Sequence, residues 1–266
     1  MKTIIQLFEE SVAKFSGNAF LNEKTESVYK PLSYKQTRDK VYDMAAGLMA
    51  MGIKHGDRLA LLSEGRNDWV ISELAILYAG AINVPLSVKL EPADLMFRLN
   101  HSDTRMVIVS GNHADKIRQI QAEIPSLEKV ILLDKPEIPG FNEISKEDVE
   151  KLGKTFLENT PEAFVQRWQN VKGDDYANIS YTSGTTADPK GIILSHRNYT
   201  ANVEQASTLM DIPEYFRTLL ILPLDHSFAH VAGIYSFMFK GASLGFVEPA
   251  KNPMMALKNI PVNIRE

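Results

Sequence analysis

Short apolar runs alternate with amphipathic helical segments in the first half of the chain, and this alternation limits the fold more than any other feature. The runs expected to form strands are 58–63, 81–86, 106–110 and 129–134. Helical periodicity fills the intervals, with helices expected at 67–78, 92–100 and 112–122. Strands and helices in this order form βαβ units, whose parallel sheet has helices on both faces. The pattern therefore predicts a doubly wound α/β fold.

Particular residues predict where these helices begin. Asn67 or Asp68 is expected to cap the first helix, because short polar side chains accept hydrogen bonds from free N–H groups. Pro92 is expected to open the second helix, where its missing N–H does no harm. Asn112 is expected to cap the third.

The remaining segments indicate a second unit of the same class. The chain begins with expected helices at 4–15 and 34–51, which enclose expected strands at 19–23 and 27–34. A Pro-rich stretch, Lys135–Gly140, is typical of a boundary. One or two surface helices are expected within 145–170, followed by strands at 178–183, 191–195, 218–222 and 242–248 and helices at 197–210, 227–240 and 253–260. The predicted organisation is a first α/β subdomain over 1–135 and the start of a second over 171–266.

The loop Tyr181–Gly191, which reads YTSGTTADPKG, carries the strongest functional signal. Six of its residues are Ser, Thr or Gly, and Lys190 stands near its end. Hydroxyls, free backbone N–H groups and an ammonium group are the donors that a phosphate needs. A P-loop is disfavoured, because Pro189 and Gly191 replace its second Gly and its Ser or Thr. A polar hairpin turn without a ligand is the commoner outcome for a generic loop of this composition.

The same loop resembles the signature of the adenylate-forming superfamily, which includes acyl-CoA synthetases, peptide-synthetase adenylation domains and luciferases. Ten of its eleven residues fit that pattern, and Ala187 stands where Gly is usual. If this position needs a positive φ, Ala costs about 1 kcal/mol. Four other segments resemble further motifs of the family in the same order: 32–34, 77–86, 195–198 and 222–228. The resemblance covers nearly the whole chain from Leu32 onward.

The resemblance implies activation of a carboxylic acid with ATP and Mg²⁺. The acid attacks the α-phosphate, pyrophosphate leaves, and in the CoA ligases the thiol of CoA captures the acyl adenylate. By the same resemblance Lys190 and His226 are catalytic, and His226 and Gly233 contact the acid. The residues implied to hold the phosphates are Thr182, Ser183, Gly184, Thr185, Thr186 and Lys190.

Within the family, the segment LPLDHSF at 222–228 looks like the long-chain fatty acid–CoA ligase version of its motif. Adenylation of a short acid or an amino acid, and a nucleotide-binding domain without turnover, are the alternatives. The family's adenine-side loop, ribose-binding Asp and C-terminal lid are not found in these residues. The resemblance therefore implies an incomplete N-terminal large domain that does not complete the reaction alone.

Composition excludes several other classes of protein. With 33 Asp+Glu against 29 Lys+Arg, the chain lacks the positive field that nucleic acid or an anionic membrane requires. It has no cysteine, which excludes disulfides and thiolate metal sites. His226 and His230 are four residues apart, but Ser227 occupies the Glu position of H-E-x-x-H, so no metal site is predicted. Without a targeting or transmembrane segment, a cytoplasmic location is expected. The oligomeric state stays open.

Overall fold

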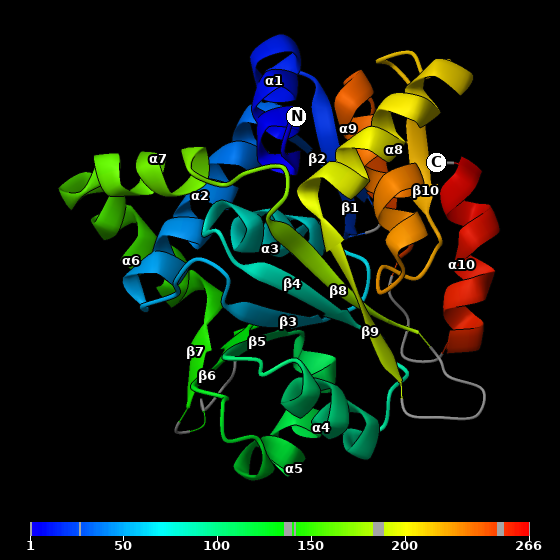
Figure 1. Ribbon diagram of the computed structural model, residues 1–266. Coiled ribbons are helices and arrows are strands. Elements are labelled where there is room, and N and C mark those ends of the chain that lie inside the picture. Colours follow the sequence, from blue (N-terminus) through cyan, green and yellow to red (C-terminus); the bar gives the residue numbers. More distant parts are fainter. Residues whose placement is uncertain are drawn as a thin grey trace.

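The computed structural model describes residues 2–26, 28–135, 140, 142–182, 189–248 and 253–265, with the backbone alone for 253–257. The described strands form a seven-stranded and a four-stranded sheet, and helices pack around both (Figure 1). The architecture is mixed α/β with mainly parallel sheets, as the sequence predicts.

The larger sheet has the strand order β7-β6-β5-β3-β4-β8-β9. Every neighbouring pair in it is parallel except β8 and β9, which are antiparallel. The central strands β4 and β5 are buried over their whole length, which explains why every residue in them except Asn83 is apolar. Their bounds are β3 Arg58–Leu62, β4 Ile82–Leu86, β5 Met106–Val109, β6 Lys129–Leu132, β7 Glu143–Ser145, β8 Tyr176–Thr182 and β9 Lys190–Ser195.

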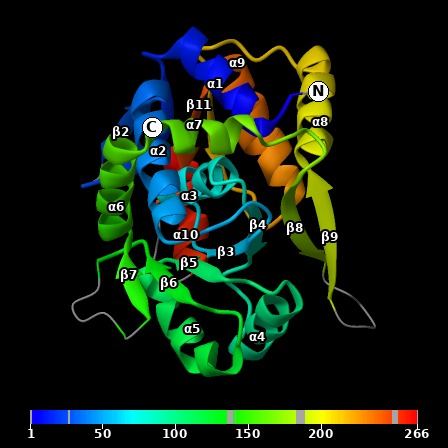
Figure 2. The same ribbon diagram turned by 60° about the vertical axis from the view of Figure 1, so that its left-hand side comes forward.

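Helices cover both faces of this sheet (Figures 1 and 2). Helices α4 (Pro92–His101) and α5 (Ala114–Ile120) cover one face and bury Leu95, Leu99 and Ile117 against it. Helices α2 (Tyr34–Ala50) and α3 (Asn67–Tyr78) cover the other face and share its core. Helices α6 (Lys146–Asn159) and α7 (Pro161–Gln169) pack outside α2 and α3. The doubly wound arrangement is therefore confirmed.

The smaller sheet has the order β10-β11-β1-β2. Strand β1 pairs in parallel with β11 and antiparallel with β2. The helical segments around this sheet are α1, α8, the π-helical segment η3 and α9, and the last helix of the chain is α10. The bounds are α1 Ile4–Phe15, β1 Ala19–Thr25, β2 Val28–Ser33, α8 His196–Leu209, β10 Arg217–Leu220, η3 Ala229–Tyr235, α9 Ser236–Lys240, β11 Ser243–Phe246 and α10 Pro253–Arg265.

The two sheets exchange strands between the two halves of the chain. β1 and β2 come from the first half and pair with β11, whereas β8 and β9 come from the second half and extend the sheet of β3 to β7. The boundary expected near 135–140 therefore does not separate the two sheets.

Two of the predicted helix caps are wrong. Asn67 is the first residue of α3, and its N–H donates to Glu23 Oε2 at 2.9 Å. Asn112 lies in a 3₁₀ turn and donates to Glu64 Oε1 at 2.8 Å, while α5 begins at Ala114. A carboxylate distant in sequence accepts from the Asn67 N–H in α3 and from the Asn112 side-chain amide before α5, and a local pattern reveals neither contact. Pro92 opens α4 as predicted.

Candidate functional site

The loop 181–191 connects two antiparallel strands, so the order strand–loop–strand is confirmed. The Cα atoms of Thr182 and Lys190 are partners across β8 and β9, which places the two residues side by side at the base of the hairpin. Both are exposed, and Lys190 makes no ion pair with the part of the chain that the structure describes. The predicted phosphate-binding residues Ser183, Gly184, Thr185 and Thr186, together with Ala187, lie outside the described residues.

The base of this hairpin is attached to α4 through Tyr181. Its hydroxyl donates to the Arg98 carbonyl at 3.2 Å and lies 2.8 Å from His101 Nδ1. The Arg98 guanidinium stands 5.7 Å from the centre of the Tyr181 ring. Burial raises the pKa of Tyr181, so the phenol stays protonated and can donate. The strand that leads into the loop therefore has a fixed direction.

His226 lies in the turn between β10 and η3, and its ring is exposed. The Phe228 N–H donates to His226 Nδ1 at 3.2 Å, so the neutral imidazole carries its proton on Nε2. The N–H groups of His226 and Ala229 also close this turn, on the carbonyls of Pro223 at 3.3 Å and His226 at 2.9 Å. The exposed ring edge is therefore a hydrogen-bond donor.

Gly233 lies inside η3, which has π-helical hydrogen bonding. A Cβ added at Gly233 would stand 2.5 Å from Leu220 Cδ2. Glycine at this position therefore allows η3 to approach β10. The helix expected at 227–240 thus consists of the π segment followed by α9, and Gly241 ends it with a φ of +77°. π-Helical turns are rare and occur frequently at functional sites.

The predicted site residues belong to two parts of the fold. Thr182 and Lys190 lie on the larger sheet, whereas His226 and Gly233 follow β10 of the smaller one. Among the described residues no hydrogen bond or ion pair joins His226 to the hairpin. The two parts are linked instead by a buried ion pair between His230 of η3 and Glu73 of α3. A glutamate in the mostly apolar helix α3 is the sequence signal that could have revealed this pair.

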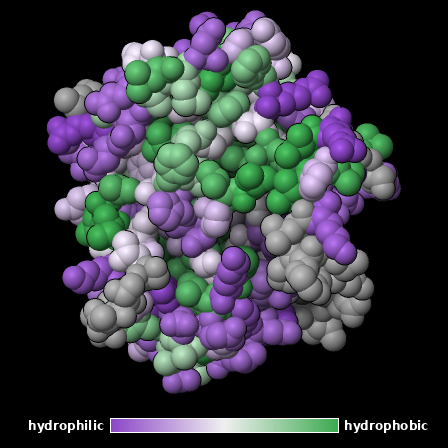
Figure 3. All heavy atoms as spheres, turned by 90° about the vertical axis from the view of Figure 1, so that its right-hand side faces the viewer, coloured by the Kyte–Doolittle hydropathy of each residue, from purple (hydrophilic) through white to green (hydrophobic). Residues whose placement is uncertain are grey.

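Apolar side chains are exposed beside the predicted site residues. Ile221, Leu222 and Phe228 flank His226 and are 55%, 40% and 61% exposed, and Ile192 and Ile193 of β9 are 44% and 49% exposed. Figure 3 shows apolar atoms gathered across the face that lies on the right in Figure 1. An apolar ligand could be held on such a surface.

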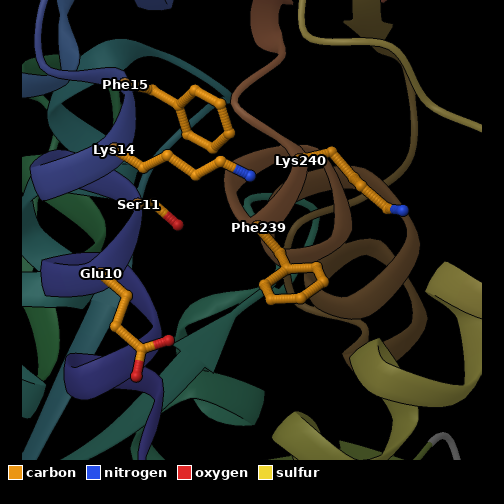
Figure 4. Close-up of a pocket in the computed structure, with 6 residues that line it drawn as sticks. All are labelled: Glu10, Ser11, Lys14, Phe15, Phe239 and Lys240. Carbon is orange, nitrogen blue, oxygen red and sulfur yellow. The ribbon is translucent and has the colours of Figure 1, made fainter.

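A separate depression lies between α1 and α9 (Figure 4). It contains none of the predicted site residues, and its lining consists of Glu10, Ser11, Lys14, Phe15, Phe239 and Lys240. Within the described ranges no group of three or more His, Asp or Glu side chains could hold a metal ion. In the same part of the chain, no helix combines the length and apolar character that crossing a bilayer requires.

Comparison with known proteins places this arrangement in context. The family model of the AMP-binding enzymes matches residues 8–263. The chain is 29% identical to long-chain-fatty-acid–CoA ligase 5 of Rattus norvegicus over 93% of its own length and 38% of the relative's. It is 28% identical to 4-hydroxybutyrate–CoA ligase 2 of Metallosphaera sedula, over 83% of this chain and 39% of that protein.

A solved structure extends the similarity to the fold. The anthranilate CoA ligase AuaEII, in complex with anthranoyl-AMP, superposes with a TM-score of 0.81 at 20% identity. The match covers 97% of this chain and 48% of that protein. The chain thus spans less than half the length of these relatives.

Proposed function

Because this chain belongs to the family of AMP-binding enzymes, we propose that the whole protein activates a fatty acid with ATP and transfers the acyl group to CoA. The relatives at 28% and 29% identity are named as CoA ligases. The activity proposed here is that of the complete protein, of which these residues are the part that carries the hairpin 181–191.

The base of the hairpin is the observation that carries this proposal. Thr182 and Lys190 present a hydroxyl and an ammonium group next to each other, and Tyr181 fixes the direction of the strand below them. This donor set fits the β- and γ-phosphates of ATP, to which Lys190 adds a point charge. In the proposed site the residues 183–186 complete the cradle with hydroxyls and backbone N–H groups.

The proposed reaction has two transfers. A carboxylate oxygen of the acid attacks the α-phosphorus, the bond to the bridging oxygen breaks, and pyrophosphate leaves. The CoA sulfur then attacks the acyl carbonyl, and AMP leaves. Lys190 holds the charge of the departing pyrophosphate, and His226 donates from Nε2 to an oxygen of the carboxylate or the α-phosphate. Mg²⁺ neutralises phosphate charge when bound, and no described residue is assigned to it.

The apolar surface beside His226 favours an acid with an apolar acyl chain. Ile221, Leu222 and Phe228 are exposed and lie near His226 in the sequence. Gly233 lies on the helical segment proposed to line the acyl chain. The relatives act on acids of different size, because one is named for long-chain fatty acids and another for 4-hydroxybutyrate. A short acid or an amino acid is therefore the alternative substrate.

Acid-dependent exchange of radioactive pyrophosphate into ATP tests the proposal. The exchange rate of the full-length protein is measured with acetate, 4-hydroxybutyrate, octanoate, palmitate and a mixture of amino acids, and the rates are compared. We expect octanoate and palmitate to drive exchange. We expect Lys190→Ala and His226→Ala each to lower the rate about a hundredfold, which is the usual effect of removing one donor to a developing anion.

Lys172→Ala is the matched control, because Lys172 is an exposed lysine before β8 and outside the loop. It should leave the exchange rate unchanged. Exchange driven only by amino acids or short acids would overturn the fatty acid assignment and keep adenylation. Folded protein without exchange for any acid would favour a nucleotide-binding domain without turnover.

A further inference from the structure

The ion pair between His230 and Glu73 is buried where the two sheets meet. His230 Nδ1 lies 2.9 Å from Glu73 Oε1, and the side chains are 0% and 2% exposed. Aromatic rings enclose the imidazole: Tyr199 stacks on it at 5.8 Å, and Trp69 meets it edge-on at 5.3 Å. The pair therefore joins α3 to η3 in surroundings that exclude water.

The geometry shows which nitrogen of His230 donates a hydrogen bond. His230 Nε2 lies 2.7 Å from the Leu224 carbonyl, which can only accept, so Nε2 carries a proton. Nδ1 faces the Glu73 carboxylate, which also accepts a hydrogen bond from Asn83 Nδ2 at 3.3 Å. Burial alone would lower the pKa of His230, but Glu73 and the Leu224 carbonyl together raise it above 6.5. Glu73 therefore favours the protonated form of the ring, and Nε2 donates to the Leu224 carbonyl.

One end of this ring holds the turn that carries His226. Leu224 lies within the turn Pro223–His226, and its carbonyl is the acceptor for His230 Nε2. The other end of the ring is attached to α3, which belongs to the larger sheet's core. The turn is thus connected through one side chain to the part of the molecule that carries the phosphate hairpin.

We propose that His230 and Glu73 are positioning residues for His226, which together hold the turn 223–226 at a fixed place relative to the larger sheet. This inference rests on the function proposed above for His226. Neither residue touches the substrates. Their effect is on the direction of the His226 ring, and a misplacement of about 1 Å costs about a hundredfold in rate.

Stability and positioning can be separated experimentally, because replacing both members of a buried ion pair by groups of similar shape is often neutral for stability. Removing His230 alone would leave a buried carboxylate without its cation and could prevent folding. The informative variant is therefore Glu73→Gln/His230→Phe, which keeps an aromatic ring against Tyr199 and leaves no charge. Ser236→Ala is the matched control, because Ser236 is buried at the start of α9 and its hydroxyl has no hydrogen-bond partner among the described residues.

The rate of acid-dependent pyrophosphate exchange into ATP in the full-length protein is the first readout. We expect the double variant to fold with an unchanged Tm, to lose tenfold to a hundredfold in kcat and to keep its KM for ATP, because the phosphate hairpin lies on the other sheet. Ser236→Ala should keep the wild-type kcat. In the His226→Ala background the double substitution should cause no further loss. A folded double variant with wild-type kcat, or with a loss that multiplies that of His226→Ala, would overturn the inference.

Hydrogen exchange is the second readout and needs no catalysis. The amides of Phe228 and Ala229 both donate to His226. They should exchange faster in the double variant than in the wild-type protein or in Ser236→Ala. Unchanged protection would overturn the inference. If the wild-type protein shows no acid-dependent exchange, the proposed function fails, and the amide protection still decides whether the pair holds the turn.

Discussion

Two buried histidines show how tertiary surroundings change the chemistry of one residue type. His230 has a buried carboxylate beside it, which raises the pKa of its imidazole. His196 is 1% exposed, and its Nδ1 accepts from the Ile4 N–H at 3.4 Å. Burial, only partly opposed by Asp175, lowers the pKa of His196 to about 4. The two residues therefore affect stability in opposite directions as the pH changes.

The depressed pKa of His196 predicts a loss of stability in mild acid. Between pH 6.5 and about 4 the unfolded chain binds a proton that the folded chain refuses, so the free energy of unfolding falls as the pH decreases. The full loss corresponds to about 3 kcal/mol. Urea unfolding at pH 7, 6 and 5 measures how the free energy of unfolding falls over this part of the range. His196→Gln keeps an acceptor for the Ile4 N–H and should reduce the slope of the free energy of unfolding against pH.

The contribution of His230 to the free energy of unfolding changes with pH in the opposite direction. It is complete below pH 6.5 and is lost as the pH rises through the raised pKa of His230. Carboxylates whose pKa is lowered in the folded protein, such as Glu64, lose their contribution to the free energy of unfolding only below about pH 4.5. The difference in slope between wild type and His196→Gln from pH 7 to 5 therefore reports the contribution of His196. An equal slope for wild type and His196→Gln would contradict the assignment.

Helices α2 and α6 approach each other closely because glycines face each other between them. A Cβ added at Gly153 would stand 1.7 Å from the Asp43 carbonyl and 2.8 Å from the Gly47 N. A Cβ at Gly47 would stand 2.1 Å from the Val149 carbonyl. The contacts involve backbone atoms, which cannot rotate away. Helix α6, expected as a surface helix, therefore packs directly on the backbone of α2, because glycine has no side chain to separate the two helices.

Gly153→Ala is predicted to separate α6 from α2. We expect a loss of at least about 2 kcal/mol in the free energy of unfolding, because overpacking against backbone cannot be relieved by a rotamer change. Denaturant unfolding monitored by circular dichroism measures it. Gly17→Ala is the matched control, since a Cβ there meets nothing within 4 Å. Equal midpoints for the two variants would show that the helices can move apart freely.

At the scale of the whole molecule, the exchange of strands makes the two halves depend on each other. β1 lies between β11 and β2, so the first half supplies the interior of the smaller sheet. β8 pairs with β4, so the second half continues the larger sheet. The buried pair of Glu73 and His230 crosses between the same halves. The molecule should therefore unfold as one unit.

Separate fragments 1–135 and 171–266 test this dependence. Each fragment would expose a sheet edge and the apolar face that its partner covers, so we expect neither to show a cooperative thermal transition by circular dichroism. Mixing the two fragments should restore part of the structure. A cooperative transition in either fragment alone would instead support two independent subdomains.

The sequence by itself determined the class of fold, the order of its elements and the family. Local patterns suffice for these, because periodicity, glycines and prolines act within a few residues, and the loop 181–191 carries its chemistry in consecutive residues. Even the strand–loop–strand order around that loop could be predicted, since Ile192–Leu194 reads as a strand.

Only the tertiary structure decided which strands share a sheet, which groups cap α3 and which charge lies beside His230. These features depend on partners far apart in the sequence, such as Glu23 with Asn67 and Glu73 with His230. A local pattern contains no information about such contacts, because they form only when packing brings the segments together. The roles of His226 and Gly233 stay predictions for the same reason: resemblance assigns them, and the surroundings of the bound acid have to test them.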